Sequence, residues 1–473
     1  MLGVPICLLG IVGLVVNPFP EDAWYSTWTF LFWPTQLYGA AYTPVAAPAY
    51  VYGTAHLIAL AFGVGLEHEF RLAAAMLGVL QFVSCGFILL SCRALGRPRI
   101  GVAVSLGTLL FAQSTYMTQS FWSEGVINPL VAATMYALVR LYVSPPPTLR
   151  STILASVLAG AGVGLLTISR FVPGLMVAPL LFVAWQRLER SRALVYSISS
   201  VGIVVAIILG QMAANQYRFG KFVLSDSAGL HLWDVVSAIA DEVLTQSEDY
   251  QILKNITPIR GKLIFEACHD VYAKTFREPC HERLGRAAIH GVLFHPLAFV
   301  AQAYEYFTGQ LTAAPDTFGL WMQPGGGGPL SRTSHLPPLF ASAHVWGEAL
   351  QVVHAAVQKS YKIIVLGSIW ITLCGVIGAV VQRPRAQQVS FQARSYGQPG
   401  VSTAYAPLAG VLLAAFLACT FATACLARPQ GRYSAIFLPL LAVLFCYALG
   451  LVWELVETAG RAIAVEPRST HRD

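Results

Sequence analysis

The sequence has little charge. Charged residues make up 11% of its 473 residues, less than half of the roughly 25% found in ordinary soluble domains. Hydrophobic residues make up 56%, and the mean hydropathy is +0.61. This composition excludes an ordinary soluble enzyme. We therefore expect an all-α polytopic membrane protein, because helices satisfy their own backbone hydrogen bonds in lipid.

Several common site patterns are also missing. The nine cysteines contain no C-x2-C pair of the kind that binds zinc. The glycine run Gly325–Gly328 lacks the Lys-Ser/Thr of a phosphate-binding P-loop. No repeat of fixed period is visible. Cys268 and Cys280 lie together in a polar region, so a disulfide between them stays open.

What is present is a series of apolar runs. Each span needs roughly 20 apolar residues, and the runs predict about ten transmembrane helices, within a range of about 9 to 12. The first run, Leu2–Val16, lacks a basic n-region and a cleavage site, so we expect a retained helix. The stretch His56–Val64 would add to the count if it spans. The remaining predicted spans are Leu72–Cys92, Ile100–Tyr116, Gly125–Tyr142, Ile153–Ile168, Phe171–Trp185, Leu194–Ala213, Ile363–Val381, Leu408–Cys425 and Ser434–Trp453.

The runs divide the chain into three parts. Residues 1–213 form an N-terminal transmembrane module, whose first loop, 17–56, is rich in Trp and Tyr and is expected to form surface helices. Residues 214–358 form a large polar insert, and residues 359–473 form the last spans and a short tail. Within the insert, Leu232–Leu244 and Arg283–Thr308 are expected to be helical, the second with a break at Pro296.

Orientation follows from the arginines. Cytoplasmic loops carry an excess of Lys and Arg, and a cytoplasmic N-terminus places the arginine clusters in cytoplasmic loops. The net charge of +7 therefore reflects topology, and we expect no nucleic-acid partner. The other side then receives the large insert and the ionisable residues Glu21, Asp22, Glu124, Arg170 and Arg432.

Singly, each of these residues has a structural explanation. Acids at helix starts favour the helix dipole, and arginines at span ends extend toward the interface. Collected on one face, they suit an anionic lipid substrate. A guanidinium binds phosphate through two hydrogen bonds, and a carboxylate can accept the proton of a hydroxyl nucleophile.

The order of several motifs resembles the GT-C membrane glycosyltransferases, specifically the bacterial relatives of protein O-mannosyltransferases and of lipid A aminoarabinose transferases. Pro20-Glu21-Asp22-Ala23-Trp24-Tyr25 is similar to the Pro-Asp-Glu-Ala-x-Tyr of their first extracytoplasmic loop. The order of the two acids is reversed here, so either can be the base. The other similar elements are Gly63 to Arg71, Ser123-Glu124, Thr167 to Pro173, Asn215 to Gly220, His295-Pro296 and Gly431 to Pro439.

The resemblance implies a polyprenyl-phosphate-linked sugar as donor and a glycan, lipid or protein as acceptor, with membrane lipids around the protein. Glu21 or Asp22 would deprotonate the acceptor hydroxyl, and Glu124 would orient the acceptor or tune the base. Arg432, with Arg170 and the neighbouring Tyr433, would bind the donor phosphate. Direct displacement implies inversion at the anomeric carbon.

No cofactor is implied for certain, and a divalent metal near the paired acids stays open. The expected place is the bacterial inner membrane, with the active site on its extracytoplasmic face.

Two other functions are compatible with the sequence. An O-antigen polymerase or ligase would use Arg and His in the large loop, which contains His281, His290, His295 and His335. A transporter or lipid flippase would show internal repeats and ionisable groups near the midplane. The acidic pair in the first loop favours the transferase.

Overall fold

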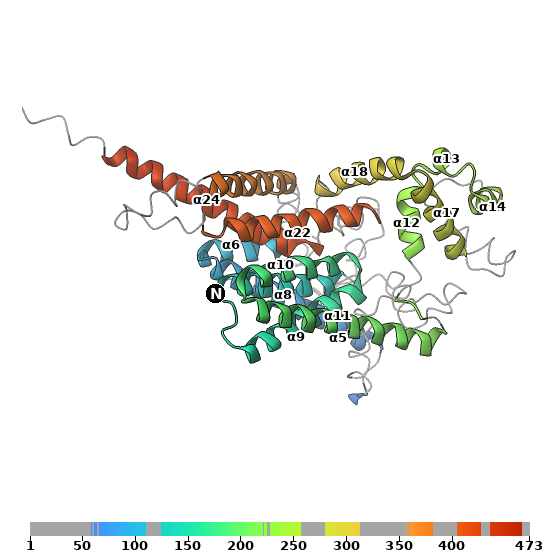
Figure 1. Ribbon diagram of the computed structural model, residues 1–473, viewed down its shortest axis with the longest axis horizontal. Helices are drawn as coiled ribbons and strands as arrows, with labels where there is room; N and C mark the ends of the chain where they lie inside the picture. Colours follow the sequence, from blue (N-terminus) through green and yellow to red (C-terminus); the bar gives the residue numbers. More distant parts are fainter. Residues whose placement is uncertain are drawn as a thin grey trace, which may run out of the picture.

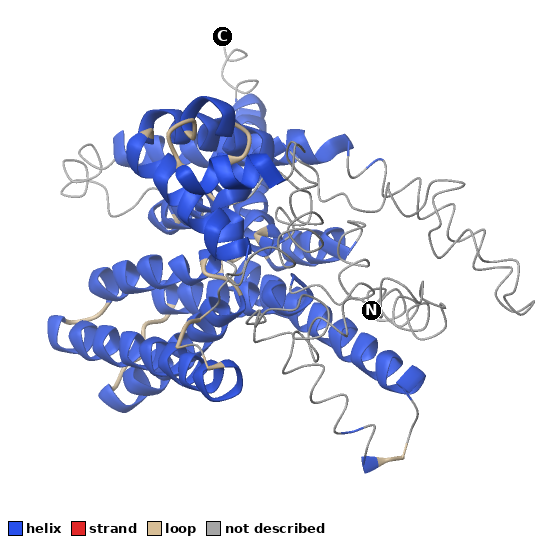
Figure 2. Ribbon diagram, turned by 90° about the vertical axis from the view of Figure 1, so that its right-hand side faces the viewer, coloured by secondary structure: helices blue, strands red, loops and turns tan. Residues whose placement is uncertain are grey.

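The computed structural model describes residues 58, 61–63, 66–109, 124–220, 222–224, 228–256, 280–312, 356, 359–381, 404–426 and 436–465. All elements in these ranges are helices (Figure 2). The predicted first span, the aromatic loop at 17–56, Cys268, the glycine run and the end of the chain after residue 465 lie outside them.

Seven of the described helices are long and apolar enough to cross a membrane. They confirm an all-α, multi-pass membrane protein and seven of the predicted spans. The predicted span Phe171–Trp185 corresponds to a shorter apolar stretch of helix, Val172–Arg187. Of the predicted span Ile100–Tyr116, residues 100–109 lie in α6 and residues 110–116 lie outside the described residues. The bundle consists of α5 (Leu66–Ala94), α6 (Pro98–Leu109), α8 (Glu124–Val143), α9 (Leu149–Ser169), η1 (Val172–Met176), α10 (Val177–Arg187), α11 (Arg190–Phe219), the helix Lys359–Val381, α22 (Ala406–Ala424) and α24 (Leu438–Val465).

Successive helices of the bundle lie side by side (Figure 1) and run in opposite directions. α8 and α9 pack on each other and are joined by a short loop, so α9 runs antiparallel to α8. η1 and α10 then reverse the direction of the chain again. Glu124, Arg170 and Gly220 therefore lie at one end of the bundle, the Glu124 end. Tyr142 and Arg187 lie at the opposite end, the Arg187 end.

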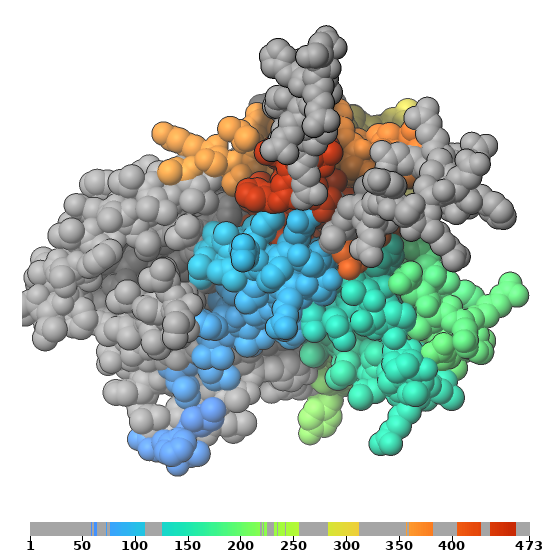
Figure 3. Space-filling view, turned by 90° about the vertical axis from the view of Figure 1, so that its left-hand side faces the viewer, coloured from blue at the N-terminus to red at the C-terminus, as the bar shows by residue number. Residues whose placement is uncertain are grey.

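Arginines hold the turns at the Arg187 end. The Nε atom of Arg187 donates to the carbonyl oxygen of Tyr142 at 2.8 Å, and its guanidinium lies 4.7 Å from the centre of the Tyr142 ring. Arg192 donates to the carbonyls of Pro146 and Pro147 at 3.0 and 3.1 Å. Figure 3 shows this end, where the α5–α6 (light blue), α8–α9 (teal) and α10–α11 (green) regions are neighbours. The predicted arginine-rich loops of these three turns thus share one face.

The helices differ in how deeply they are buried. In the α8 span 61% of the residues are buried, against 17% in α11 and 17% in the helix Lys359–Val381. The outward faces of these two peripheral helices carry large apolar side chains such as Ile198, Leu209 and Trp370. Apolar faces of this kind are suited to contact lipid tails. α8, in contrast, forms part of the interior of the bundle.

The insert contains five described helices, which lie at the Glu124 end (Figure 1). The predicted stretch Leu232–Leu244 is two helices rather than one. The predicted break at Pro296 is confirmed, since α17 and α18 meet at 106°. α18 packs on α22 through an edge-to-face contact of Phe307 and Phe421, with ring centres 5.7 Å apart. The helices are α12 (Ala228–Val236), α13 (Ala240–Val243), α14 (Glu248–Ile256), α17 (Cys280–Phe294) and α18 (Pro296–Thr312).

Candidate functional site

The predicted site residues fall in two groups. Glu21, Asp22, Arg432 and Tyr433 lie outside the described residues, and their roles stay predictions. Glu124 and Arg170 lie inside them. Glu124 is the first residue of α8, as predicted from the start of the apolar run. An acid at this position is favoured by the partial positive charge of a helix start.

Arg170 lies in a tight turn between α9 and η1. Its backbone is extended, with φ −160° and ψ 139°, and its N–H closes α9 by donating to the carbonyl of Leu166 at 2.8 Å. Gly174 packs so closely on Thr167 that a Cβ there would overlap the Thr167 side chain. Cys419 of α22 lies 3.9 Å from the carbonyl oxygen of Val172. The Thr167 to Pro173 motif therefore fixes the position of Arg170 at the Glu124 end.

The Asn215 to Gly220 motif has a structural explanation. Gly220 adopts φ +69° and ends α11, a conformation that favours glycine. The Nδ2 atom of the buried Asn215 then donates to the carbonyls of Val223 and Leu224 at 2.9 and 3.1 Å. These bonds fold the chain back onto the helix that it has just left.

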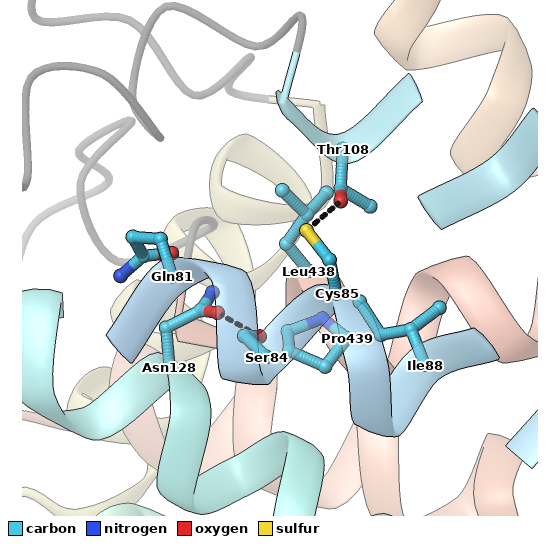
Figure 4. A pocket seen from close by; sticks show the side chains of 8 residues that line it. All are labelled: Gln81, Ser84, Cys85, Ile88, Thr108, Asn128, Leu438 and Pro439. Carbon is cyan, nitrogen blue, oxygen red and sulfur yellow. Dashed lines mark hydrogen bonds between the residues drawn. The ribbon is translucent and has the colours of Figure 1, made fainter. Parts of the chain in front are cut away.

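A buried group of polar side chains lies among α5, α6 and α8, next to the start of α24 (Figure 4). We call it the polar cluster; it consists of Gln81, Ser84, Cys85, Thr108 and Asn128, and it lines a small cavity. Gln81, Ser84 and Asn128 are only 6%, 2% and 5% exposed. Polar groups this deep in a membrane bundle are costly unless they are hydrogen-bonded.

The hydrogen bonds of the polar cluster connect α5 to its neighbours. Gln81 Nε2 donates to the carbonyl oxygen of Gly125 at 3.1 Å. Ser84 Oγ donates to Asn128 Oδ1 at 2.7 Å (Figure 4). The residue numbers increase in the same direction on both helices, from Gln81 and Gly125 to Ser84 and Asn128, so α5 and α8 are parallel. On the other side of α5, Cys85 Sγ lies 3.7 Å from Thr108 Oγ1.

One predicted motif reaches this cavity, because the Gly431 to Pro439 motif contributes Leu438 and Pro439 at the start of α24. α8, which starts at Glu124, contributes Asn128. The cavity itself holds no ionisable carboxylate, guanidinium or imidazole among its lining residues. The described side chains of the cavity connect helices by hydrogen bonds.

Of the four insert histidines named from the sequence, His281, His290 and His295 lie in α17 or at its end, and His335 lies outside the described residues. The His290 ring packs on Phe294, with ring centres 4.4 Å apart, and its buried Nδ1 makes no hydrogen bond to a described residue. His295 lies exposed at the bend before Pro296. Within the described part of the chain, no group of three or more His, Cys, Asp or Glu residues could hold a metal ion.

The polar cluster is absent from the sequence-based predictions. Gln81, Ser84 and Cys85 follow the i, i+3, i+4 spacing of one helix face inside an apolar run, which is a usable signal. A second signal is Asn128-Pro129 inside the next long run. Neither tells which neighbouring helix the polar face meets, because that depends on the rotation of each helix in the bundle.

No protein-family model and no curated protein matches the chain. Two solved structures do, both of ArnT from Cupriavidus metallidurans, a lipid A aminoarabinose transferase. The crystal structure bound to undecaprenyl phosphate has 12% identity and TM-score 0.34, and the match covers 99% of this chain and 81% of that one. The apo structure has 13% identity and TM-score 0.33, with 97% and 79% covered. TM-scores this low do not establish a common fold.

Proposed function

We propose that this protein is an integral membrane glycosyltransferase that moves a sugar from a polyprenyl-phosphate donor to an acceptor outside the cytoplasm. The observation that carries the proposal is the order of motifs along the chain, from Pro20-Glu21-Asp22 to Gly431-Arg432-Tyr433. The multi-pass helical bundle supports it, because a lipid-linked donor requires an enzyme in the membrane. So does the position of Glu124 and Arg170 at the end of the bundle that carries the insert.

In the proposed reaction, Glu21 or Asp22 takes the proton of the acceptor hydroxyl. The acceptor oxygen forms a bond to the anomeric carbon of the sugar while the bond from that carbon to the phosphate oxygen breaks. The polyprenyl phosphate leaves with the electron pair. Arg432, Tyr433 and Arg170 stabilise the charge that develops on the phosphate. A single displacement of this kind inverts the anomeric carbon.

The three-part division of the chain belongs to the same proposal. The module 1–213 would supply the acids, the insert 214–358 would cover the acceptor, and the part 359–473 would supply Arg432. The Glu124 end would face away from the cytoplasm, since the arginine-held turns lie at the other end. The bacterial inner membrane is the proposed location.

The test is a comparison of envelope glycans by mass between cells with and without the gene. We expect one sugar unit to be missing without it and to return with the unmodified gene. The double variant Glu21→Gln/Asp22→Asn should fail to restore it. Glu189→Gln is the matched control, because Glu189 is an exposed carboxylate at the Arg187 end. Full restoration by the double variant at equal expression would overturn the assignment of the base.

The orientation has its own test. A cysteine introduced at Gly326 should react with a membrane-impermeant maleimide added outside intact cells. A cysteine introduced at Ser144, in the turn between α8 and α9, should react only after the membrane is opened. Labelling of the Gly326 position from the cytoplasmic side alone would contradict the proposed topology.

A further inference from the structure

The first turn of α8 lacks one of its own hydrogen bonds. Pro129 lies inside α8, four residues after Gly125. A proline has no backbone N–H, so the usual i to i−4 bond to the Gly125 carbonyl cannot form. The proline ring also clashes with the carbonyl of residue i−4 and bends it away from the helix axis. Gly125 is the second residue of α8, directly after Glu124.

Gln81 of α5 supplies the missing donor. Its Nε2 atom lies 3.1 Å from the carbonyl oxygen of Gly125, and the Gln81 side chain is almost fully buried. A proline inside a membrane span is tolerated when a neighbouring helix satisfies the freed carbonyl. The bond therefore ties the first turn of α8 to α5 rather than to the rest of α8.

We propose that Gln81 is a positioning residue that fixes the backbone at Glu124 through the Gly125 carbonyl that Pro129 leaves without a donor. The role in catalysis rests on the proposed function, in which Glu124 orients the acceptor or tunes the base. A shift of the first turn would displace Glu124 from the acceptor, and displacements of this kind lower the rate of a positioned reaction without changing its groups.

The Ser84–Asn128 hydrogen bond provides a matched control. It joins the same two helices at 2.7 Å, and both partners are as deeply buried as Gln81. It connects two side chains, however, and does not replace a backbone bond. Ser84→Ala should weaken the contact of α5 with α8 without releasing the Gly125 carbonyl.

The experiment uses the full-length protein in membranes with a polyprenyl-phosphate sugar as donor. We expect Gln81→Leu to lower kcat about tenfold, with the KM for the donor unchanged, because only the acceptor side is displaced. Pro129→Ala restores an N–H at residue 129, which can bond to the Gly125 carbonyl in place of Gln81. The double variant Gln81→Leu/Pro129→Ala should therefore recover kcat to within about twofold. Ser84→Ala should not be rescued by Pro129→Ala.

Hydrogen exchange of the backbone amides in peptides covering residues 124–132 gives a readout independent of activity. Exchange should be faster in Gln81→Leu than in Ser84→Ala and should slow again in the double variant. Equal effects of Gln81→Leu and Ser84→Ala, or no rescue by Pro129→Ala, would overturn the positioning role. If the unmodified protein transfers no sugar, the proposed function fails, and the exchange pattern still decides whether Gln81 holds the turn.

Discussion

The α9–α11 and α5–α8 interfaces are built in different ways. On α9, a Cβ at Gly160 would lie 2.6 Å from the Ser200 carbonyl oxygen, and a Cβ at Gly164 would lie 2.7 Å from Ile207. Glycine thus lets these two helices approach closely. On α5, Gly86 has no atom near its Cβ position, and the contact with α8 includes the hydrogen bonds of Gln81 and Ser84 beside the packing of Phe87 on Tyr136.

The difference shows what each interface provides. Lipid is as apolar as a leucine side chain, so helices in a membrane associate by close packing and by hydrogen bonds. Close packing through small residues, with one buried hydrogen bond from Ser200 Oγ to the carbonyl oxygen of Ser156 at 3.1 Å, holds α11, which is largely lipid-facing, against the bundle. Hydrogen bonds have direction, and they fix the rotation and height of α8, which carries Glu124. We infer that the first interface serves mainly stability and that the second also fixes the position of α8.

The largest effect on stability is expected from placing a large side chain in the α9–α11 interface. Gly160→Leu would place a side chain against the backbone of Ser200, which cannot move aside as a flexible side chain could. We expect a loss of about 3 kcal/mol or more in stability, seen as a lower thermal transition in detergent. Gly202→Leu is the control, since no atom lies within 4 Å of the Cβ position at Gly202. Equal transitions for the two variants would refute the close packing.

A smaller effect on stability is expected from breaking the Ser84–Asn128 hydrogen bond of the α5–α8 interface. Asn128→Leu leaves the Ser84 hydroxyl without its acceptor and should lower stability by about 1 kcal/mol, the size of a hydrogen bond between helices in a membrane. Ser84→Ala/Asn128→Leu removes both partners and should recover part of that loss. Thermal unfolding of the unmodified protein, the two single variants and the double variant measures it. Strict additivity of the two changes would mean that the 2.7 Å contact contributes nothing.

The smallest effect is expected outside both interfaces. Arg97 and Glu454 form an ion pair at the Arg187 end, with side chains 18% and 24% exposed. Arg97→Gln should lower stability by about 0.5 kcal/mol, since ion pairs with access to solvent contribute little. Comparing thermal transitions in low and high salt checks this, because screening should shrink the difference. A loss larger than that of Asn128→Leu would show that this end also fixes the bundle.

The spans were predictable because their composition alone defines them. The predicted Gly125–Tyr142 is the helix Glu124–Val143, and the break at Pro296 was predictable because proline lacks a backbone N–H. The shared face of Glu124 and Arg170 followed from counting arginines in loops, and the alternating helices agree with it.

The polar cluster could not be predicted in the same way. Gln81 and Gly125 are far apart in the chain, and their contact depends on how α5 and α8 rotate about their axes. The polar spacing inside one apolar run indicates a polar helix face, but it does not show which neighbouring helix that face meets. Nor does it show that Pro129 needs a partner from another helix. The roles of Glu21, Asp22, Arg432 and Tyr433 stay predictions from motifs.

The central claim is most directly tested by the release of polyprenyl phosphate from a labelled polyprenyl-phosphate sugar. The assay uses membranes that contain the protein together with an envelope extract as acceptor. We predict release by the unmodified protein and by Glu189→Gln, and no release above background by Glu21→Gln/Asp22→Asn at equal expression. Undiminished release by the double variant, or no release by the unmodified protein, would contradict the account.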